Sequence, residues 1–308
     1  HFLSWSYGEK RELTPGITLR FTDVGHLLGS AAIEVWIQEG ETSRKIVFSG
    51  DIGNKRKPLI RDPLYIDEAD YVVMECTYGD RLHDPVPDHA SILARIVQET
   101  LDRGGNVVIP AFAVGRTQEL LYIFRKIKAD HMVTGHDNFE VYVDSPLAVE
   151  ATNVFKENLS DCYDQETKEL VMKGINPISF PGLKLSVTSE ESKNINFDMK
   201  PKVIISAAGM CDAGRIRHLW RKECTIVFTG YQSVGTLGRS LLEGAKEVRL
   251  FGETIHVEAH LEKMDGMSSH ADRDGLTEWL QAIKSKPKQV FLVHGDDQSC
   301  QSYQALLQ

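Results

Sequence analysis

Four short blocks of the sequence carry residue types that bind divalent metal ions. His26 lies in Gly-His-Leu-Leu-Gly-Ser and Asp51 in Ser-Gly-Asp-Ile-Gly, while His270 and His294 lie far downstream. Taken alone, His26 favours a hydrogen-bonded structural histidine, and Asp51 favours a helix cap or turn. Taken together they are more informative, because zinc prefers neutral imidazole and a carboxylate that can bridge two ions. The set therefore indicates a candidate zinc site.

Glu75 is a second kind of candidate, an acidic residue at the end of an apolar run. It follows Tyr71–Met74, so we expect a buried carboxylate, which is costly unless it has a partner. His270 is the expected partner, because a carboxylate bonded to imidazole fixes the tautomer and raises the pKa of the ring. Such a histidine suits a general acid near neutral pH. The alternative for Glu75 is an N-cap or a structural ion pair.

Glycine-bearing turns form a third group, in which backbone N–H groups could approach phosphate. One turn runs from Ser206 through Gly209 to Arg215, and another contains Gly230. The block Pro-Ala-Phe-Ala-Val-Gly before Arg116 is similar. Arg215 could add a charge-assisted bond. Each turn alone is weak evidence, because tight strand–helix connections also need glycine.

The elements that must position these residues alternate between strands and helices. Continuous apolar runs predict strands buried on both faces, with functional residues at their carboxyl ends. These runs are Lys45–Phe48, Tyr71–Met74, Asn106–Ile109, Val141–Val143, Val203–Ile205, Thr225–Phe228 and Val290–Val293. Helical spacing of apolar residues predicts three helices. These cover Ala90–Arg103, Thr117–Ile127 and Arg273–Ile283. Because the metal-type residues flank this alternation, we expect one domain inserted into another.

Size and composition bound the class of protein. The chain has 308 residues, with 42% hydrophobic and 26% charged side chains, which is ordinary for a globular protein with room for two domains. No apolar run approaches the roughly 18–20 residues of a membrane span, so we expect no membrane association. Five cysteines without a Cys-x-x-Cys pair argue against a disulfide framework and indicate a cytoplasmic location. A net charge of −9 argues mildly against broad nucleic-acid binding. Two local clusters of basic residues, within residues 215–222 and 55–61, weaken that argument.

In this order the blocks resemble the β-CASP family of metallo-β-lactamase-fold ribonucleases. The likeness covers nearly the whole chain, including Glu-Cys-Thr-Tyr-Gly-Asp-Arg from Glu75 and Asp-Ser-Pro-Leu-Ala from Asp144. The sequence is most similar to the compact bacterial and archaeal members of this family, which are related to RNase J and to the pre-mRNA cleavage endonuclease. The resemblance implies an α/β fold, namely a partial αββα metallo-β-lactamase sandwich with an inserted β-CASP domain. We expect the sandwich domain at residues 1–80 and 267–308 and the inserted domain at 81–266.

The resemblance also implies roles for the site residues. His26, Asp51 and His294 would bind two zinc ions, with Asp51 bridging them, and the zincs would activate hydroxide for attack on a phosphodiester. His270, oriented by Glu75, would stabilise or protonate the departing oxygen, so that Asp51, Glu75 and His270 form the catalytic set. The expected substrate-binding residues are Arg116, Ser206, Gly209, Arg215 and Gly230. The expected partner is single-stranded RNA, which the protein would cut as an endonuclease, as a 5′-to-3′ exonuclease or in both ways. A homodimer is possible.

One block of the family is missing from the sequence. A His-x-His-x-Asp-His run, which supplies most of the metal ligands in this fold, should precede His26. Because the other blocks are intact, we interpret the chain as a piece cut at both ends, which binds zinc weakly and has little nuclease activity by itself. One alternative is a non-catalytic RNA-binding or scaffold subunit, which would have no need of the site residues. Another is a hydrolase of small esters or thioesters, which the inserted domain and the Glu75–His270 pair disfavour.

Overall fold

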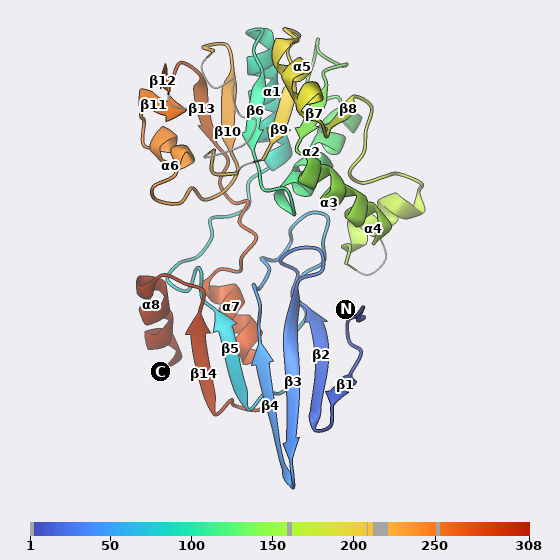
Figure 1. Cartoon of the computed structure of the whole chain (residues 1–308), viewed down its shortest axis with the longest axis vertical. Coiled ribbons are helices and arrows are strands. Elements are labelled where there is room, and N and C mark those ends of the chain that lie inside the picture. Colours follow the sequence, from blue (N-terminus) through green and yellow to red (C-terminus); the bar gives the residue numbers. More distant parts are fainter. Residues whose placement is uncertain (1–2, 159–161, 208, 212–220, 251–252) are drawn as a thin grey trace. The chain divides into compact units, whose positions relative to one another are not determined.

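The computed structural model describes residues 3–158, 162–207, 209–211, 221–250 and 253–308 (Figure 1). The chain divides into two compact units. Unit 1 comprises His1–Asp84, Ser160–Thr167 and Ser268–Gln308, and unit 2 comprises Pro85–Leu159 and Lys168–Met267. Unit 2 is therefore inserted in the sequence of unit 1. The domain limits expected from the sequence, after residue 80 and before residue 267, stay a prediction.

The sequence gives no sign of the short stretch Ser160–Thr167 in unit 1. Backbone contacts with a distant loop explain its place there. Arg61 donates its N–H to the carbonyl of Cys162 at 2.9 Å, and Leu59 donates to the carboxylate of Asp164 at 3.1 Å. A contact between segments a hundred residues apart leaves no periodic pattern, so sequence analysis misses it.

Unit 1 is built on a six-stranded mixed sheet with the order β1-β2-β3-β4-β5-β14. Its strands are β1 (Arg11–Thr14), β2 (Ile17–Asp23), β3 (Ala31–Glu39), β4 (Thr42–Phe48), β5 (Tyr71–Glu75) and β14 (Gln289–Val293). The first four strands are antiparallel, whereas β4, β5 and β14 are parallel (Figure 1). The carboxyl ends of these three strands therefore meet at one edge of the sheet, beside the loop that joins β2 to β3.

Two helices cover one face of this sheet, α7 (Arg273–Gln281) and α8 (Asp297–Leu307). Buried side chains of β3, β4 and β5 form one core cluster with Leu276 and Trp279 of α7 and Tyr303 of α8. Trp279 is 1% exposed, and its indole N–H donates to the carbonyl of Leu64, so the ring is both buried and satisfied. This core holds the segments that carry the candidate site.

The opposite face of the same sheet is apolar and exposed. The strand register aligns Ile33, Phe48, Val73 and Phe291 across four neighbouring strands. Ile33, Phe48 and Phe291 are 36%, 42% and 44% exposed. The expectation that β4 and β14 are buried on both faces is therefore wrong, because side chains on one face of each strand are exposed. Unit 1 therefore exposes a row of apolar side chains on this face of its sheet.

A buried ion cluster stabilises the antiparallel part of the sheet. Glu34 is 0% exposed and accepts two bonds from Arg20 at 2.7 Å, one from Lys45 at 2.7 Å and one from the hydroxyl of Thr22 at 2.6 Å. Burial acts to raise the pKa of Glu34, but these bonds outweigh it and hold the pKa below its ordinary value. The carboxylate is therefore ionised in the folded chain.

We expect Glu34→Gln to lower the free energy of unfolding by about 3 kcal/mol at pH 7, because Arg20 and Lys45 lose a buried counter-charge. A depressed pKa contributes stability above the unfolded value of about 4.3, and that stability is lost as the pH falls through the folded pKa. The deficit, measured by urea unfolding, should therefore shrink between pH 7 and pH 3. Glu39→Gln, at the exposed end of the same strand, is the control. Equal urea midpoints for the two variants at pH 7 would contradict the prediction.

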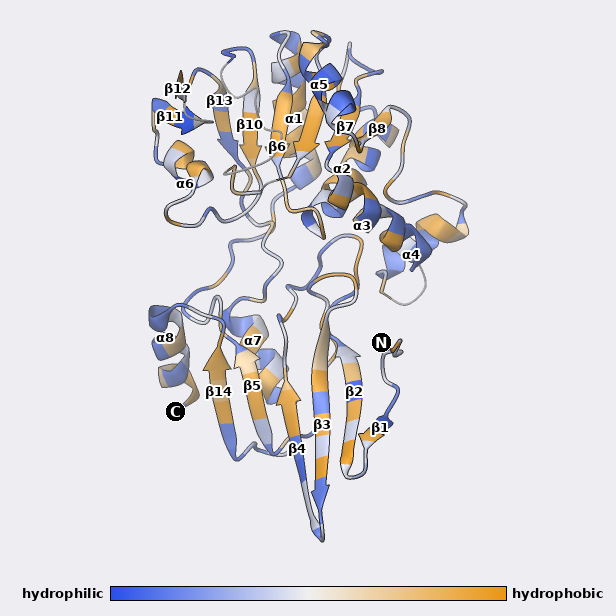
Figure 2. Cartoon of the chain, in the orientation of Figure 1, coloured by the Kyte–Doolittle hydropathy of each residue, from blue (hydrophilic) through white to orange (hydrophobic). Residues whose placement is uncertain are grey.

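Unit 2 contains a six-stranded parallel sheet with the order β13-β10-β6-β9-β7-β8. Its strands are β6 (Val107–Pro110), β7 (Val141–Asp144), β8 (Leu183–Ser186), β9 (Val203–Ser206), β10 (Thr225–Phe228) and β13 (His260–Lys263). A separate hairpin pairs β11 (Glu247–Leu250) with β12 (Glu253–His256). Every residue of β6, β9 and β10 is buried, and Figure 2 shows these central strands as mainly apolar. The prediction of strands buried on both faces is confirmed here.

Six helices of the described chain lie in sequence between β5 and β13. They are α1 (His89–Asp102), α2 (Arg116–Ala129), α3 (Pro146–Glu157), α4 (Gln165–Met172), α5 (Ser189–Phe197) and α6 (Leu237–Leu242). The three helices predicted from apolar spacing are confirmed as α1, α2 and α7. Gly104 ends α1 with a φ of +77°, and Gly105 lets the carbonyl of Glu223 approach, since a Cβ there would lie 1.9 Å from that oxygen. No helix in the described part of the chain is long and apolar enough to cross a membrane.

Candidate metal centre

Five of the predicted site residues lie in unit 1 and come together at one edge of its sheet. They are His26, Asp51, Glu75, His270 and His294. His26 follows β2, Asp51 follows β4, Glu75 ends β5 and His294 follows β14, while His270 precedes α7. The parallel pairing of β4, β5 and β14 explains why residues so far apart in sequence meet.

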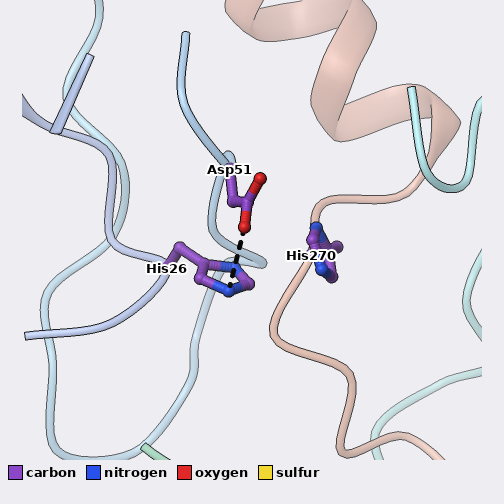
Figure 3. A group of neighbouring side chains, drawn as sticks. All are labelled: His26, Asp51 and His270. Atoms are coloured by element: carbon purple, nitrogen blue, oxygen red, sulfur yellow. Dashed lines mark ion pairs between the residues drawn. The ribbon is translucent and has the colours of Figure 1, made fainter. Parts of the chain in front are cut away.

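Asp51 stands between two histidines. Its Oδ2 lies 3.8 Å from Nε2 of His26, and its Oδ1 lies 3.5 Å from Nε2 of His294. His26, Asp51 and His270 each offer a ligand atom, and these atoms lie within 4.8 Å of one another. Figure 3 shows the carboxylate of Asp51 directed at the ring of His26, with His270 beside them. Imidazole nitrogens around a carboxylate are a donor set that fits zinc.

His26 is held in a form that can bind a metal ion. Its Nδ1 lies 3.2 Å from the carbonyl oxygen of Ser269, so Nε2 is the nitrogen that faces Asp51. Burial lowers the pKa of His26 to about 4, helped by His270 and Lys57, against the opposing effect of Asp51. The ring is therefore neutral at physiological pH and needs to lose no proton to act as a ligand.

Glu75 and His270 form the buried pair that the sequence predicts. Nδ1 of His270 lies 3.0 and 3.1 Å from the two carboxylate oxygens, and Glu75 is 1% exposed. The carboxylate also accepts from the N–H of Ile52 at 2.7 Å and lies 2.6 Å from the hydroxyl of Thr77. The pairing is confirmed, whereas the catalytic role assigned to it stays a prediction.

Opposite pKa shifts follow from this pairing. Burial alone would raise the pKa of Glu75, but the bonds from His270, Thr77 and Ile52 lower it. Burial alone would lower the pKa of His270, but the bond and charge of Glu75, with Asp51, raise it above its ordinary value. Because an ionised carboxylate only accepts, Nδ1 of His270 is the donor and Nε2 is left for a substrate or an ion.

The backbones of two glycine-containing blocks, around Gly25 and Gly53, are in direct contact next to the site. A Cβ at Gly53 would lie 2.1 Å from the carbonyl oxygen of Gly25 and 2.7 Å from the nitrogen of His26. Gly53 also donates its N–H to the carbonyl of Val24 at 2.7 Å. Gly53 is therefore required because the loop that carries His26 rests directly on the loop that follows Asp51.

We expect Gly53→Ala to lower the free energy of unfolding by about 2 kcal/mol, because backbone must move to admit the methyl group. The displaced His26 should also weaken zinc binding by roughly tenfold. Gly230→Ala is the matched control for unfolding, since Gly230 also lacks a positive φ and a Cβ there meets nothing within 4 Å. Urea unfolding and calorimetric zinc titration measure the two effects. Equal stability of the two variants would refute the close approach.

Two residues without a predicted role complete the site. The hydroxyl of Thr77 lies 2.6 Å from Glu75, 2.9 Å from the carbonyl oxygen of His294 and 3.4 Å from Nδ1 of His270. The ammonium of Lys57 lies 2.9 Å from the hydroxyl of Ser269 and 3.2 Å from the carbonyl oxygen of His26. The position of Thr77, two residues after Glu75 at a strand end, is the only sequence signal for its role.

Four of the predicted substrate-binding residues, those that the structure describes, lie in unit 2. The guanidinium of Arg116 bonds to Glu119 at 2.7 Å and to the carbonyl of Met267, so it is engaged within the unit. Ser206 ends β9 and is 1% exposed. The side chain of Gln232 donates to the carbonyl of Gly209 at 3.0 Å, which brings the turns of Gly209 and Gly230 together. Arg215 lies outside the described residues. The binding role of this set stays a prediction.

Comparison with known proteins decides the family. Two family models match the chain, the Beta-Casp domain over residues 117–241 and the Zn-dependent metallo-hydrolase RNA specificity domain over residues 254–308. Over 305 residues the chain is 35% identical to Ribonuclease TTHA0252 of Thermus thermophilus, a match that covers 97% of this chain and 67% of that protein. The chain belongs to the β-CASP family of metallo-β-lactamase-fold ribonucleases. This membership confirms the metallo-β-lactamase fold with an inserted β-CASP domain, in a family of metal-dependent hydrolases.

Other β-CASP relatives are longer than this chain. It is 31% identical over 299 residues to an RNase J-like protein of Methanocaldococcus jannaschii, covering 94% of this chain and 66% of that protein. It is 30% identical over 314 residues to the Transcription termination factor FttA of Methanosarcina mazei, covering 97% and 48%. The chain therefore spans about half to two thirds of the length of these β-CASP proteins.

Proposed function

We propose that this chain carries the catalytic centre of a zinc-dependent ribonuclease that hydrolyses RNA phosphodiester bonds, as an endonuclease, a 5′-to-3′ exonuclease or both. One observation carries the proposal. The Asp51 carboxylate faces Nε2 of both His26 and His294, and the buried Glu75–His270 pair lies next to it. A scaffold subunit would have no use for a neutral ligand histidine beside a proton-holding histidine.

The residues of the chain divide the chemistry between them. Zinc, when bound, would supply a Lewis acid for the phosphate and a nucleophile at neutral pH. His26 offers a neutral nitrogen, His294 offers a second imidazole nitrogen, and Asp51 directs one carboxylate oxygen towards each of them. His270, with its pKa raised by Glu75, holds a proton that it can give to the departing oxygen. Glu75 fixes the tautomer and direction of the ring.

We propose that the family site would hold two zinc ions and that His26, Asp51 and His294 are among the residues that would hold them. Zinc takes about four ligands, and His26, Asp51 and His294 supply only part of two such sets. The 308 residues by themselves should therefore hold zinc weakly and cleave RNA slowly. Elemental analysis of the demetallated and reconstituted chain measures this. About two tightly held ions per chain would contradict weak binding.

Cleavage of end-labelled single-stranded RNA, with the chain in excess over RNA, tests the proposal. We expect slow cleavage that requires added zinc and stops with a chelator. RNA binding without cleavage at any zinc concentration would favour the scaffold alternative. Turnover of a chromogenic ester without any RNA cleavage would favour the small-ester hydrolase. Either result would overturn the ribonuclease proposal.

Exposed aromatic rings in unit 2 support single-stranded RNA as the substrate form. Phe112 and Tyr231 are 55% and 60% exposed. A Cβ at Gly209 would lie 3.3 Å from the nitrogen of Phe112, and Gln232 bonds to Gly209, so the turns that carry the two rings adjoin. Unpaired bases stack on such rings, whereas bases within a duplex cannot reach them.

We expect Phe112→Ala and Tyr231→Ala each to weaken binding of single-stranded RNA by about 5- to 100-fold, the loss of one stacked base. Fluorescence anisotropy at fixed salt measures the affinity. Phe197→Ala, which removes an 80% exposed ring from α5, is the control. A comparable loss for Phe197→Ala, or none for the first two variants, would be incompatible with a stacking surface.

We propose two further properties, a homodimer and a cytoplasmic location. A homodimer is supported by the exposed apolar side chains of Ile33, Phe48 and Phe291, which a second copy could bury. Light scattering of the purified chain gives the mass directly. A cytoplasmic location is supported by the five cysteines, none of which forms a disulfide, as is typical of a reducing compartment.

A further inference from the structure

Two thiols lie in direct contact behind the candidate site. The sulfur atoms of Cys76 and Cys300 are 2.9 Å apart, and both cysteines are free. A disulfide bond has a sulfur–sulfur length of about 2.05 Å, so about 0.9 Å of approach separates the thiol pair from the bonded state. Cys76 follows the last residue of β5, and Cys300 lies in α8.

The two cysteines enclose the loop that carries His294. Cys76 donates its N–H to the carbonyl of Val293 at 3.0 Å, and Cys300 donates its N–H to the carbonyl of Asp296 at 2.9 Å. A Cβ at Gly295 would lie 2.7 Å from the sulfur of Cys76, so the loop rests on that sulfur. His294 itself has a φ of +52°, an uncommon conformation that its surroundings must maintain.

We propose that Cys76 and Cys300 are a modification site, a thiol pair that oxidises reversibly to a disulfide joining α8 to the end of β5. Nothing in the proposed ribonuclease chemistry uses either thiol, so the inference goes beyond that function. In a reducing compartment such a bond is transient and responds to oxidising conditions.

The oxidant is a low-molecular-weight disulfide such as oxidised glutathione. Cys300 is partly exposed and Cys76 is 0% exposed, so Cys300 reacts first. Its thiolate forms a mixed disulfide and releases one glutathione thiolate. The thiolate of Cys76 then attacks the sulfur of Cys300 and releases the second. The two cysteines lose two protons and two electrons, and the glutathione disulfide becomes two glutathione molecules.

Burial makes the second step slow. It raises the pKa of Cys76 to about 12, with a further contribution from Cys300, so little thiolate exists at neutral pH. Contact between the sulfurs compensates, because the attacking and attacked atoms are already adjacent. The disulfide should therefore form under sustained oxidising conditions and not after a brief exposure to the oxidant.

The experiment counts thiols in the purified chain, without zinc or RNA, in buffers of defined ratio of oxidised to reduced glutathione. After alkylation and mass spectrometry, the five cysteines should give three alkylated residues in the oxidising buffer. Peptide mapping should find Cys76 linked to Cys300, and dithiothreitol should restore all five. Amide hydrogen exchange at residues 294–297 should slow in the oxidised chain, because the bond closes the loop from both sides.

Three variants separate the proposal from its alternatives. Cys76→Ser should leave Cys300 as a stable mixed disulfide with glutathione, and Cys300→Ser should leave Cys76 unmodified. Cys224→Ser, in the core of unit 2, should still form the bond. Five alkylated thiols in the oxidising buffer, a bond to a different cysteine, or Cys300 held as a mixed disulfide in the parent chain would each overturn the proposal. Because the readout needs neither zinc nor RNA, it does not depend on ribonuclease activity.

Discussion

Asp51→Asn should lower RNA cleavage by about 10³-fold and remove measurable zinc binding. The reason is that the carboxylate of Asp51 faces both His26 and His294, at 3.8 and 3.5 Å. An amide has nearly the same shape but no charge, and it offers one acceptor oxygen where the carboxylate offers two. Single-turnover cleavage with added zinc and calorimetric zinc titration measure the two losses.

Asp67→Asn is the matched control for this substitution, since it removes the same charge from a side chain that is 78% exposed in unit 1. It should leave zinc binding, cleavage and the urea midpoint unchanged. Retained zinc binding by Asp51→Asn would mean that the ion is held elsewhere. Retained cleavage together with lost zinc binding would instead remove zinc from the mechanism.

The elements of unit 2 were largely predictable, because its strands obey a simple rule. β6, β9 and β10 are apolar at nearly every position, and every position is buried. Helix α1 shows the 3.6-residue spacing of a single buried face, and α2 is buried on all sides from Thr117 to Phe124. Where one local pattern accounts for the environment of a whole element, the sequence suffices.

The burial of residues in unit 1 is harder to predict from the sequence, because the two faces of its strands have different environments. Phe48 and Phe291 read as core residues but are 42% and 44% exposed. Glu34 reads as a surface residue but is 0% exposed, paired with Arg20 and Lys45. Apolar character alone does not specify whether a second layer covers a face, and a buried charge is recognisable only once its partners are placed.

The candidate site shows the same division. Sequence reasoning found His26, Asp51, Glu75, His270 and His294 because strand ends and residue types mark them. It missed Thr77 and Lys57, whose roles come from contacts with Glu75, Ser269 and the backbone. Such supporting contacts depend on where loops rest in space, and no spacing along the chain encodes them.

Glu75→Gln should return the pKa of His270 towards or below its ordinary value in the metal-free chain. The raised pKa depends on the bond and charge of Glu75, whereas the opposing effect of burial stays. Glutamine keeps the shape but removes the charge. A pH titration of the imidazole signals by NMR, with a chelator present, measures the shift. Glu278→Gln, whose side chain is 56% exposed, should leave it unchanged.

The same substitution should lower the free energy of unfolding by about 3 kcal/mol near pH 6, because it leaves His270 without the charged partner of a buried pair. The raised pKa of His270 stabilises the fold below about 6.5, and this is lost as the pH rises through the folded value. The lowered pKa of Glu75 stabilises the fold above about 4.3, and this is lost as the pH falls through the folded value. The deficit should therefore be largest between those limits and smaller at pH 9 and pH 3. A deficit independent of pH would show that packing, not the ion pair, is what the substitution disturbs.

Cleavage by Glu75→Gln should fall by about 10²- to 10⁴-fold at pH 7, the usual contribution of a positioned general acid. Zinc binding should change little, because the proposed ligands are His26, Asp51 and His294, whereas Glu75 bonds to Nδ1 of His270. The alkaline limb of the pH–rate profile, where His270 loses its proton, should move to lower pH in the variant. A rate loss with an unmoved alkaline limb would place the acid elsewhere, and a loss of zinc binding would recast His270 as a ligand that Glu75 orients.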